Sequence, residues 1–102
     1  MIRILVLGTA AGGGLPQWNC ACPNCLAARE GRIPARTQSC VAISPDGEQW
    51  YVINASPDLR EQIEAFPPLH PRPSPPRNTP IAGVLLTNAD LDHTLGLLLL
   101  RQ

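Results

Sequence analysis

Proline and glycine interrupt this chain so often that long regular elements are excluded. Its 102 residues include twelve Pro and eight Gly, and seven of the prolines lie between Pro67 and Pro80. Proline removes a backbone donor and fixes φ, so it ends helices and stays out of central strands. The pattern predicts short elements and rules out a coiled coil. Even the leucine run Leu97–Leu100 is far shorter than the ~20 apolar residues that span a membrane.

The charges of the chain balance. Eight arginines, with no lysine, face eight acidic residues, so the formal net charge is zero. This excludes a strongly basic nucleic-acid surface and an acidic tail, because both need an excess of one sign. The hydrophobic fraction of 44% is ordinary for a globular protein. The length suits one domain over residues 1–102, near the common domain size of ~100–150 residues.

The first apolar stretch, Ile2–Leu7, is typical of a short buried strand that stops at a glycine loop. A signal peptide is the alternative, but only Arg3 precedes an apolar run of about the minimum length, ~7 residues. Without a signal peptide the chain is expected in the cytoplasm. That compartment is reducing, so the four cysteines are not read first as disulfides.

The middle of the chain predicts a loop followed by a β-hairpin. Gly8–Asn19 is the loop, and its three consecutive glycines, Gly12–Gly14, allow another group to approach the backbone closely. The strands Ser39–Ser44 and Gln49–Ile53 flank Pro45–Glu48, whose Pro-Asp-Gly sequence is typical of a turn. The two strands are therefore expected to pair.

One helix is expected to begin at the dipeptide Ser56–Pro57. Serine is favoured as an N-cap and proline at the first helical position. The spacing of Leu59, Ile63 and Phe66 gives this helix one apolar face. Pro67 ends it.

The remaining elements complete a mixed α/β order. Pro67–Pro80 can be neither a helix nor a central strand, so it is expected as an extended loop or a surface linker. Ala82–Leu86 is expected as a buried strand, followed by the polar loop Thr87–Asp92 and a helix over Thr94–Leu100. A short helical turn is expected earlier, at Leu26–Arg29.

The last expected helix, Thr94–Leu100, is apolar on nearly every side. Such a helix belongs in the interior of something larger, and exposed leucines in one patch promote aggregation. The sequence therefore predicts either a piece of a longer protein or a surface buried against another chain. Self-association is expected for the 102 residues alone.

The strongest chemical motif is the CxCxxC formed by Cys20, Cys22 and Cys25. Three thiolates within six residues can converge on one ion, and thiolates favour zinc in a tetrahedral site. A redox or disulfide role and incidental burial are the alternatives. A disulfide between Cys20 and Cys22 is strained by the short spacing and leaves Cys25 unpaired.

A tetrahedral zinc site needs a fourth ligand. Cys40, His70 and His93 are the candidates in this sequence. Cys40 also fits a core strand position, and His70 fits an exposed loop between prolines. The fourth ligand can also come from outside the 102 residues.

A second motif, Thr87–His93, follows directly after the strand Ala82–Leu86. Loops at the carboxyl ends of strands are where α/β folds place their sites. Asp92 and His93, with Asp90 two positions earlier, offer carboxylate and imidazole ligands for a divalent metal such as zinc or iron(II). As alternatives, Asp92 caps a helix that begins at His93, and Asp90 is a solvated loop acid.

The two motifs together carry a resemblance. The segment Leu86–His93 resembles a degraded HxHxDH motif of the metallo-β-lactamase superfamily: Asp92 and His93 match it, whereas Asn88 and Asp90 stand in place of the two leading histidines. Other segments resemble one branch of that superfamily, the B proteins of pyrroloquinoline quinone (PQQ) biosynthesis. These segments are Leu7–Thr9, Ala10–Cys20, the CxCxxC, Ala35–Ser39 and Asn54–Asp58.

This resemblance implies a fold and a pair of metal sites. The fold is the N-terminal portion of an αβ/βα sandwich, with a Cys-rich zinc knuckle at 20–25 and a Pro-rich loop at 67–80. A structural zinc is implied at Cys20, Cys22 and Cys25. An active-site metal is implied at Asp92 and His93, with further ligands in a C-terminal part that these 102 residues lack. The 102 residues alone are therefore expected to be inactive. Loss of the two histidines fits a single metal, such as iron, better than the dinuclear zinc of a hydrolase.

The resemblance also implies two competing functions within PQQ biosynthesis. One is metal-dependent hydroxylation of the tyrosine in a peptide-derived Glu–Tyr intermediate. Asp90 then serves as a ligand, a group that orients His93 or a hydrogen-bonding group. The other is a PQQ carrier without turnover, in which Arg36 pairs with carboxylates of the ligand. A metallohydrolase is a third possibility, and the missing histidines argue against it.

Overall fold

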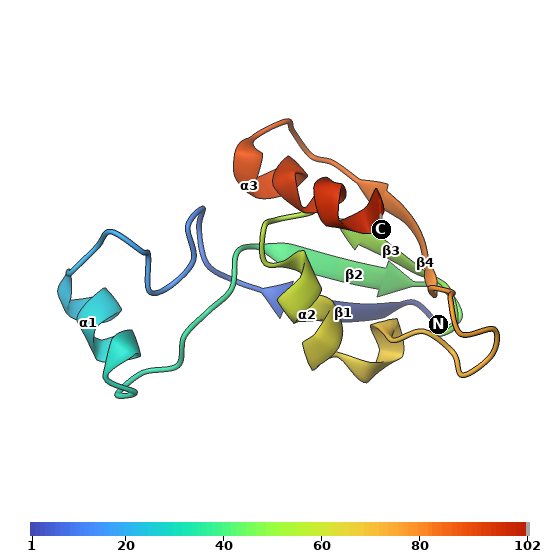
Figure 1. Cartoon of the computed structure of the whole chain (residues 1–102), viewed down its shortest axis with the longest axis horizontal. Coiled ribbons are helices and arrows are strands. Elements are labelled where there is room, and N and C mark those ends of the chain that lie inside the picture. The colour runs from blue at the N-terminus through green and yellow to red at the C-terminus, as the bar shows by residue number, and fades with distance from the viewer. Residues whose placement is uncertain (102) are drawn as a thin grey trace.

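The computed structural model describes residues 1–101, which form a small sheet with helices packed on one side (Figure 1). The elements in chain order are β1 (Arg3–Gly8), α1 (Pro23–Arg29), β2 (Cys40–Ser44), β3 (Trp50–Ile53), α2 (Leu59–Ala65), the 3-10 turn η1 (Pro67–Leu69), β4 (Ile81–Leu85), α3 (Leu91–Thr94) and the 3-10 helix η2 (Leu95–Arg101). All of them are short, as the proline and glycine content predicts.

The four strands form one sheet in the order β1-β2-β3-β4. β2 and β3 pair antiparallel, with Ala42 opposite Val52, so the predicted hairpin is confirmed. β1 pairs antiparallel with β2, and β4 pairs parallel with β3. Two parallel neighbours need a crossover connection, and the segment containing α2 provides it. The carboxyl ends of β3 and β4 therefore lie side by side.

The hydrophobic core lies on one face of the sheet. Alternate side chains of the strands point into it, as the two-residue period of a strand requires. Helix α2 contributes Leu59, and η2 adds Leu99 at the periphery. The buried residues of this cluster are Leu7, Cys40, Ala42, Trp50, Val52, Ala55, Leu59 and Leu69.

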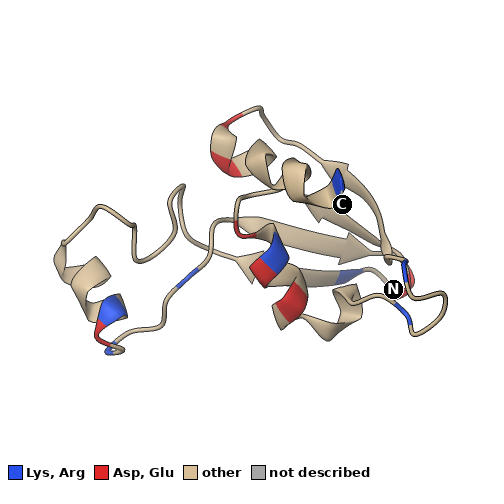
Figure 2. Ribbon diagram, in the orientation of Figure 1, with Lys and Arg blue, Asp and Glu red and all other residues tan. Residues whose placement is uncertain are grey.

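The opposite face of the sheet is apolar and open. The expectation of buried strands at Ile2–Leu7 and Ala82–Leu86 was therefore wrong: β1 and β4 are edge strands that turn only one face to the core. Ile4 and Val6 of β1 are 64% and 55% exposed, and Tyr51 and Leu85 are also exposed. Figure 2 shows that the strands carry little charge, whereas acidic residues mark α2 and the beginning of α3. The mixed sheet with helices on one face is the metallo-β-lactamase-like architecture that the resemblance implies.

The segment around α1 stands apart from the sheet, joined to it by the two chain stretches on either side (Figure 1). Helix α1 begins within the cysteine motif, three residues before the predicted turn at Leu26. Pro23 occupies its first turn and Cys22 its N-cap. Proline is favoured at that position because its missing N–H has no helical partner there.

Two predicted helix boundaries were wrong. Helix α2 begins at Leu59 rather than at Ser56, because the Ser56 hydroxyl accepts the Asp58 N–H at 3.0 Å in a preceding turn. The C-terminal helix begins at Leu91 and continues as a 3-10 helix from Leu95. Its backbone is engaged outside the helix, since the Ala55 N–H donates to the His93 carbonyl at 2.8 Å.

The proline-rich segment is mostly irregular, with one exception. Its first three residues form the turn η1, which the exclusion of helical structure did not anticipate. This turn buries Leu69 in the core. No helix within residues 1–101 has the length and apolar character needed to cross a membrane. Four leucines of η2 are exposed, Leu98 by 64% and the others by 37% to 42%, whereas Leu99 packs against the core.

Candidate metal centres

The three cysteines of the CxCxxC motif come together at the start of α1. Their sulfur atoms lie within 4.8 Å of one another, close enough to share one ion. Cys22 is exposed and Cys25 is buried. All four cysteines of the chain are free thiols. Three soft thiolates on one short turn fit zinc chemically, because zinc takes thiolates in a tetrahedral set.

Backbone N–H groups turn toward these sulfurs. The Cys25 N–H donates to the Cys22 sulfur at 3.4 Å, and the Gln17 N–H donates to the Cys25 sulfur at 3.5 Å. The bond from the Cys25 N–H is the main reason that the pKa of Cys22 falls to about 7. Arg29 closes the turn by donating to the carbonyls of Cys20 and Gln17. The local backbone therefore favours the thiolate form of Cys22. At Cys25 the bond from the Gln17 N–H also lowers the pKa, but burial and the neighbouring thiols outweigh it and the pKa of Cys25 is raised.

None of the three proposed fourth ligands joins this cluster. The Cys40 thiol is buried in the core and donates to the Asn54 carbonyl at 3.3 Å, and burial raises the pKa of Cys40 to about 11. His70 contacts the Glu64 carbonyl through Nε2. His93 belongs to a different group of ligands. Within residues 1–101 the cysteine cluster therefore offers three candidate ligands.

Asp90, Asp92 and His93 form the second cluster, at the beginning of α3. One ligand atom from each lies within 4.8 Å of the others. Asp92 and His93 are half-buried, and His93 Nε2 lies 3.7 Å from Asp92 Oδ2. The sequence predicted these three residues, and the fold brings all of them together.

The alternative in which Asp92 caps the helix was wrong. The N-cap position is Asp90, and no side chain there bonds to the helix N-terminus. Asp92 lies inside the first turn, on the helix that begins one residue before it. Its carboxylate is consequently turned toward His93 instead of toward the helix backbone.

The second cluster is anchored to the sheet by bonds that join distant parts of the chain. Asn54 follows β3 and Thr87 follows β4. The Asn54 amide accepts the Thr87 N–H at 3.0 Å and donates to the Thr87 hydroxyl at 3.1 Å. Asn54 has a φ of 68°, a conformation that Asn tolerates better than most residues. The sequence could have pointed to Asn54, because Asn54 and Thr87 each come just after the carboxyl end of an expected strand.

The glycine loop leaves room for the second cluster. A Cβ at Gly12 would lie 3.2 Å from Asp92 Oδ2, tighter than ordinary packing. The predicted close approach at this loop is therefore confirmed, and the approaching group is the Asp92 carboxylate. A half-buried pair of oxygen and nitrogen ligands with a bare backbone beside it fits a divalent metal of the zinc or iron(II) type.

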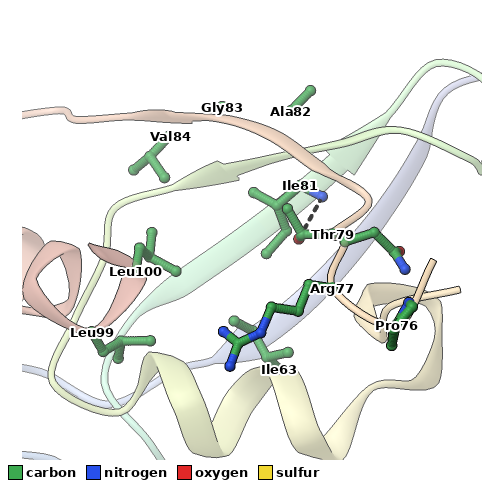
Figure 3. A pocket seen from close by; sticks show the side chains of 11 residues that line it. Ile63, Pro76, Arg77, Thr79, Ile81, Ala82, Gly83, Val84, Leu99 and Leu100 are labelled. Atoms are coloured by element: carbon green, nitrogen blue, oxygen red, sulfur yellow. Dashed lines mark hydrogen bonds between the residues drawn. The ribbon is translucent and has the colours of Figure 1, made fainter. Parts of the chain in front are cut away.

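A separate cavity of about 630 Å³ lies between β4, α2, η2 and the proline-rich segment (Figure 3). Its walls are mostly apolar, with the guanidinium of Arg77 at one side. None of the clustered cysteines, aspartates or histidine lines it. The candidate metal ligands and this hollow therefore lie in different parts of the molecule.

The fold and the ligand clusters define a class. Residues 49–102 match the family model of the beta-lactamase superfamily domain, and the chain belongs to that superfamily. Over its whole length it is similar to coenzyme PQQ synthesis protein B. It is 58% identical to that protein from Rhodopseudomonas palustris strain CGA009 and 56% identical to that of Bradyrhizobium diazoefficiens. The chain spans about a third (33%) of the length of these curated relatives.

Solved structures agree with this assignment. The crystal structure of Zn(2+)-bound PqqB from Methylobacterium extorquens matches the whole chain with a TM-score of 0.94 at 56% identity, over 34% of its own length. A new diphosphatase from the PhnP family matches 99% of the chain with a TM-score of 0.76 at 26% identity, over 35% of its length. The resemblance to the B proteins of PQQ biosynthesis is confirmed.

Proposed function

We propose that this chain forms part of a metal-dependent enzyme of PQQ biosynthesis. The observation that carries the proposal is the convergence of Asp90, Asp92 and His93 at the carboxyl end of β4, the edge where α/β sheets place their sites. The match to coenzyme PQQ synthesis protein B supplies the pathway. A reducing cytoplasm is the compartment that fits four free thiols.

The proposed reaction is hydroxylation of the tyrosine ring in a Glu–Tyr intermediate. It replaces a ring C–H with C–OH, using dioxygen as the oxidant. The second oxygen atom leaves as water, which requires two electrons and two protons from a reductant. An iron(II) ion, when bound, supplies open positions for oxygen and substrate. Asp92 and His93 hold this ion, and Asp90 is a third ligand or accepts a hydrogen bond.

The cysteine cluster has a structural role in the proposal. Cys20, Cys22 and Cys25 hold a zinc ion, and the N–H···S bonds from Gln17 and Cys25 pre-orient their sulfurs. Structural zinc sites contribute folding free energy directly. The PqqB of Methylobacterium extorquens was crystallised in a Zn(2+)-bound form, which supports zinc in this family.

The carrier alternative has weaker support at Arg36. This arginine lines a hollow of about 270 Å³, but Asp58 and Glu61 line the same hollow. Two carboxylates beside the arginine repel a ligand that itself carries carboxylates. The hydrolase alternative finds a relative in the diphosphatase, but this chain carries Asn88 and Asp90 where the hydrolase motif has histidines.

A chimaera tests the proposal. This chain replaces the matching third of the Rhodopseudomonas palustris protein, and the purified chimaera receives a Glu–Tyr peptide, iron(II), a reductant and dioxygen. We expect a product heavier by one oxygen atom, detected by mass spectrometry, and no product from the Asp92→Asn variant. Saturable PQQ binding without product in the active-site-intact chimaera supports the carrier and overturns the enzyme.

A further inference from the structure

The side-chain amide of Asn88 meets two nitrogen atoms of the second cluster. The Asp90 N–H donates to Asn88 Oδ1 at 2.9 Å, and the His93 Nδ1 atom lies 2.6 Å from the same oxygen. A backbone N–H can only donate. The atom that Asp90 meets must therefore be the amide oxygen, which fixes the orientation of the Asn88 side chain.

An amide oxygen can only accept, so the His93 Nδ1 atom that faces it must carry the proton. The competing contacts do not change this result. The Thr87 hydroxyl lies 3.5 Å from Nδ1 and donates its own proton to Asn54 at 3.2 Å. On the far side of the ring, Nε2 is 3.7 Å from Asp92, beyond hydrogen-bonding distance.

We infer that Asn88 is a positioning residue that holds neutral His93 in its Nδ1–H tautomer. The lone pair of the ring then sits on Nε2, the atom that faces Asp92. This is the form in which an imidazole binds a metal, with the other nitrogen held by an acceptor. The inference rests on the proposed function, because it concerns the same centre. In this inference Asn88 accepts the hydrogen bond from His93 Nδ1 and is not itself a metal ligand.

His70 provides an internal control with the opposite geometry. Its Nε2 atom lies 2.9 Å from the Glu64 carbonyl oxygen, which accepts only. His70 is therefore expected as the Nε2–H tautomer, the form that a free neutral histidine also favours. These are the two histidines of the chain, and one spectrum compares them.

The experiment uses the metal-free chain labelled with ¹⁵N-histidine, in mildly alkaline buffer. Long-range ¹H–¹⁵N spectra identify which ring nitrogen carries the proton. We expect Nδ1–H for His93 and Nε2–H for His70. An Nε2–H tautomer for His93 in the unmodified chain overturns the inference, and this result needs no variant that folds.

Two variants sharpen the test. Asn88→Ala is expected to move His93 toward Nε2–H and leave His70 unchanged, whereas Asn88→Asp keeps an acceptor oxygen and the Nδ1–H tautomer. Loss of a hydrogen-bond partner of this kind typically weakens metal binding about 10–100-fold. This loss is measured with Zn²⁺ in chains that also carry Cys20→Ser and Cys22→Ser, so that the cysteine cluster does not bind the added zinc. An unchanged tautomer in Asn88→Ala contradicts the inference. Failure of the chimaera to hydroxylate contradicts the proposed function only.

Discussion

The two ligand clusters of this chain are held together in opposite ways. The cysteine cluster is made by residues between Gln17 and Arg29, whose hydrogen bonds close within the same turn. The cluster of Asp90, Asp92 and His93 depends on bonds between segments more than thirty residues apart, such as Asn54 to Thr87. The first site is therefore formed by a local motif, whereas the second depends on how the strands of the sheet bring distant segments together.

The largest effect is expected at the local site. Cys22→Ser is expected to reduce the zinc content of the cysteine cluster from about one per chain to none, because a thiolate ligand is lost. Apparent binding free energies of structural zinc are about 10–16 kcal/mol. Metal analysis measures the loss, and amide hydrogen exchange locates its consequence. Residues 15–36 are expected to exchange faster while β2 and β3 stay protected.

Cys40→Ala is the matched control, since Cys40 lies in the core and outside the cluster. It is expected to retain zinc. Zinc bound as tightly by Cys22→Ser as by the unmodified chain contradicts the assignment. Global loss of protection after Cys22→Ser contradicts the distinction between a local and a fold-dependent site.

The next largest effect is expected at Gly96, where η2 contacts the segment that follows β3. The Gly96 N–H donates to the Ala55 carbonyl at 2.9 Å, and a Cβ at Gly96 would collide with the backbone of Ala55 and Ser56. Gly96→Ala is expected to destabilise the fold by about 3 kcal/mol. Urea unfolding measures this change. Trp18→Ala is the control, because Trp18 is 85% exposed and lies outside η2; it is expected to stay within about 0.5 kcal/mol of the unmodified chain.

Gly96→Ala also separates the two sites. We expect weaker metal binding by Asp92 and His93, because α3 shifts away from β3, but unchanged zinc at the cysteines. Equal loss of both metals shows that the sites share one cooperative unit and removes the contrast between them.

The sequence predicted what depends on near neighbours. The hairpin, the CxCxxC cluster and the end of α2 at proline all follow from spacing within a few residues. Asp90, Asp92 and His93 were found because ligand types lie within four positions. The buried Gln62 was not predicted, because its bonds go to Thr37 and Gln38, far away in sequence. The start of α3 was missed for the same reason, because the bond from the Ala55 N–H to the His93 carbonyl joins residues far apart in the sequence.

A smaller effect is expected from the surfaces beside the two sites. The leucines of η2 follow the second cluster in the chain, whereas Trp18, which is also exposed, precedes Cys20 by two positions. We expect the chain to self-associate at tens of micromolar through η2, because burying one leucine contributes about 1.5–3 kcal/mol. Leu98→Glu is expected to weaken this association about tenfold or more in analytical ultracentrifugation, and Trp18→Ala to leave it unchanged. A monomeric unmodified chain contradicts this prediction.

The smallest effect is a difference in thiol reactivity. In the metal-free chain the lowered pKa of Cys22, about 7, means that its thiolate forms as the pH rises through neutrality. The hydrogen bond from the Cys25 N–H favours that thiolate. Its contribution to stability is present above the ordinary thiol pKa of roughly 8.5 and is lost as the pH falls through about 7.

Iodoacetamide labelling followed by peptide mass spectrometry measures this reactivity. The labelling rate of Cys22 is expected to rise between about pH 6 and 8 and then level off, and added zinc is expected to suppress it. Cys40, with a pKa of about 11 and a buried sulfur, is expected to stay unlabelled until the sheet unfolds. Labelling of both cysteines at one rate, with or without zinc, shows that the cysteine cluster is not an independently ordered site.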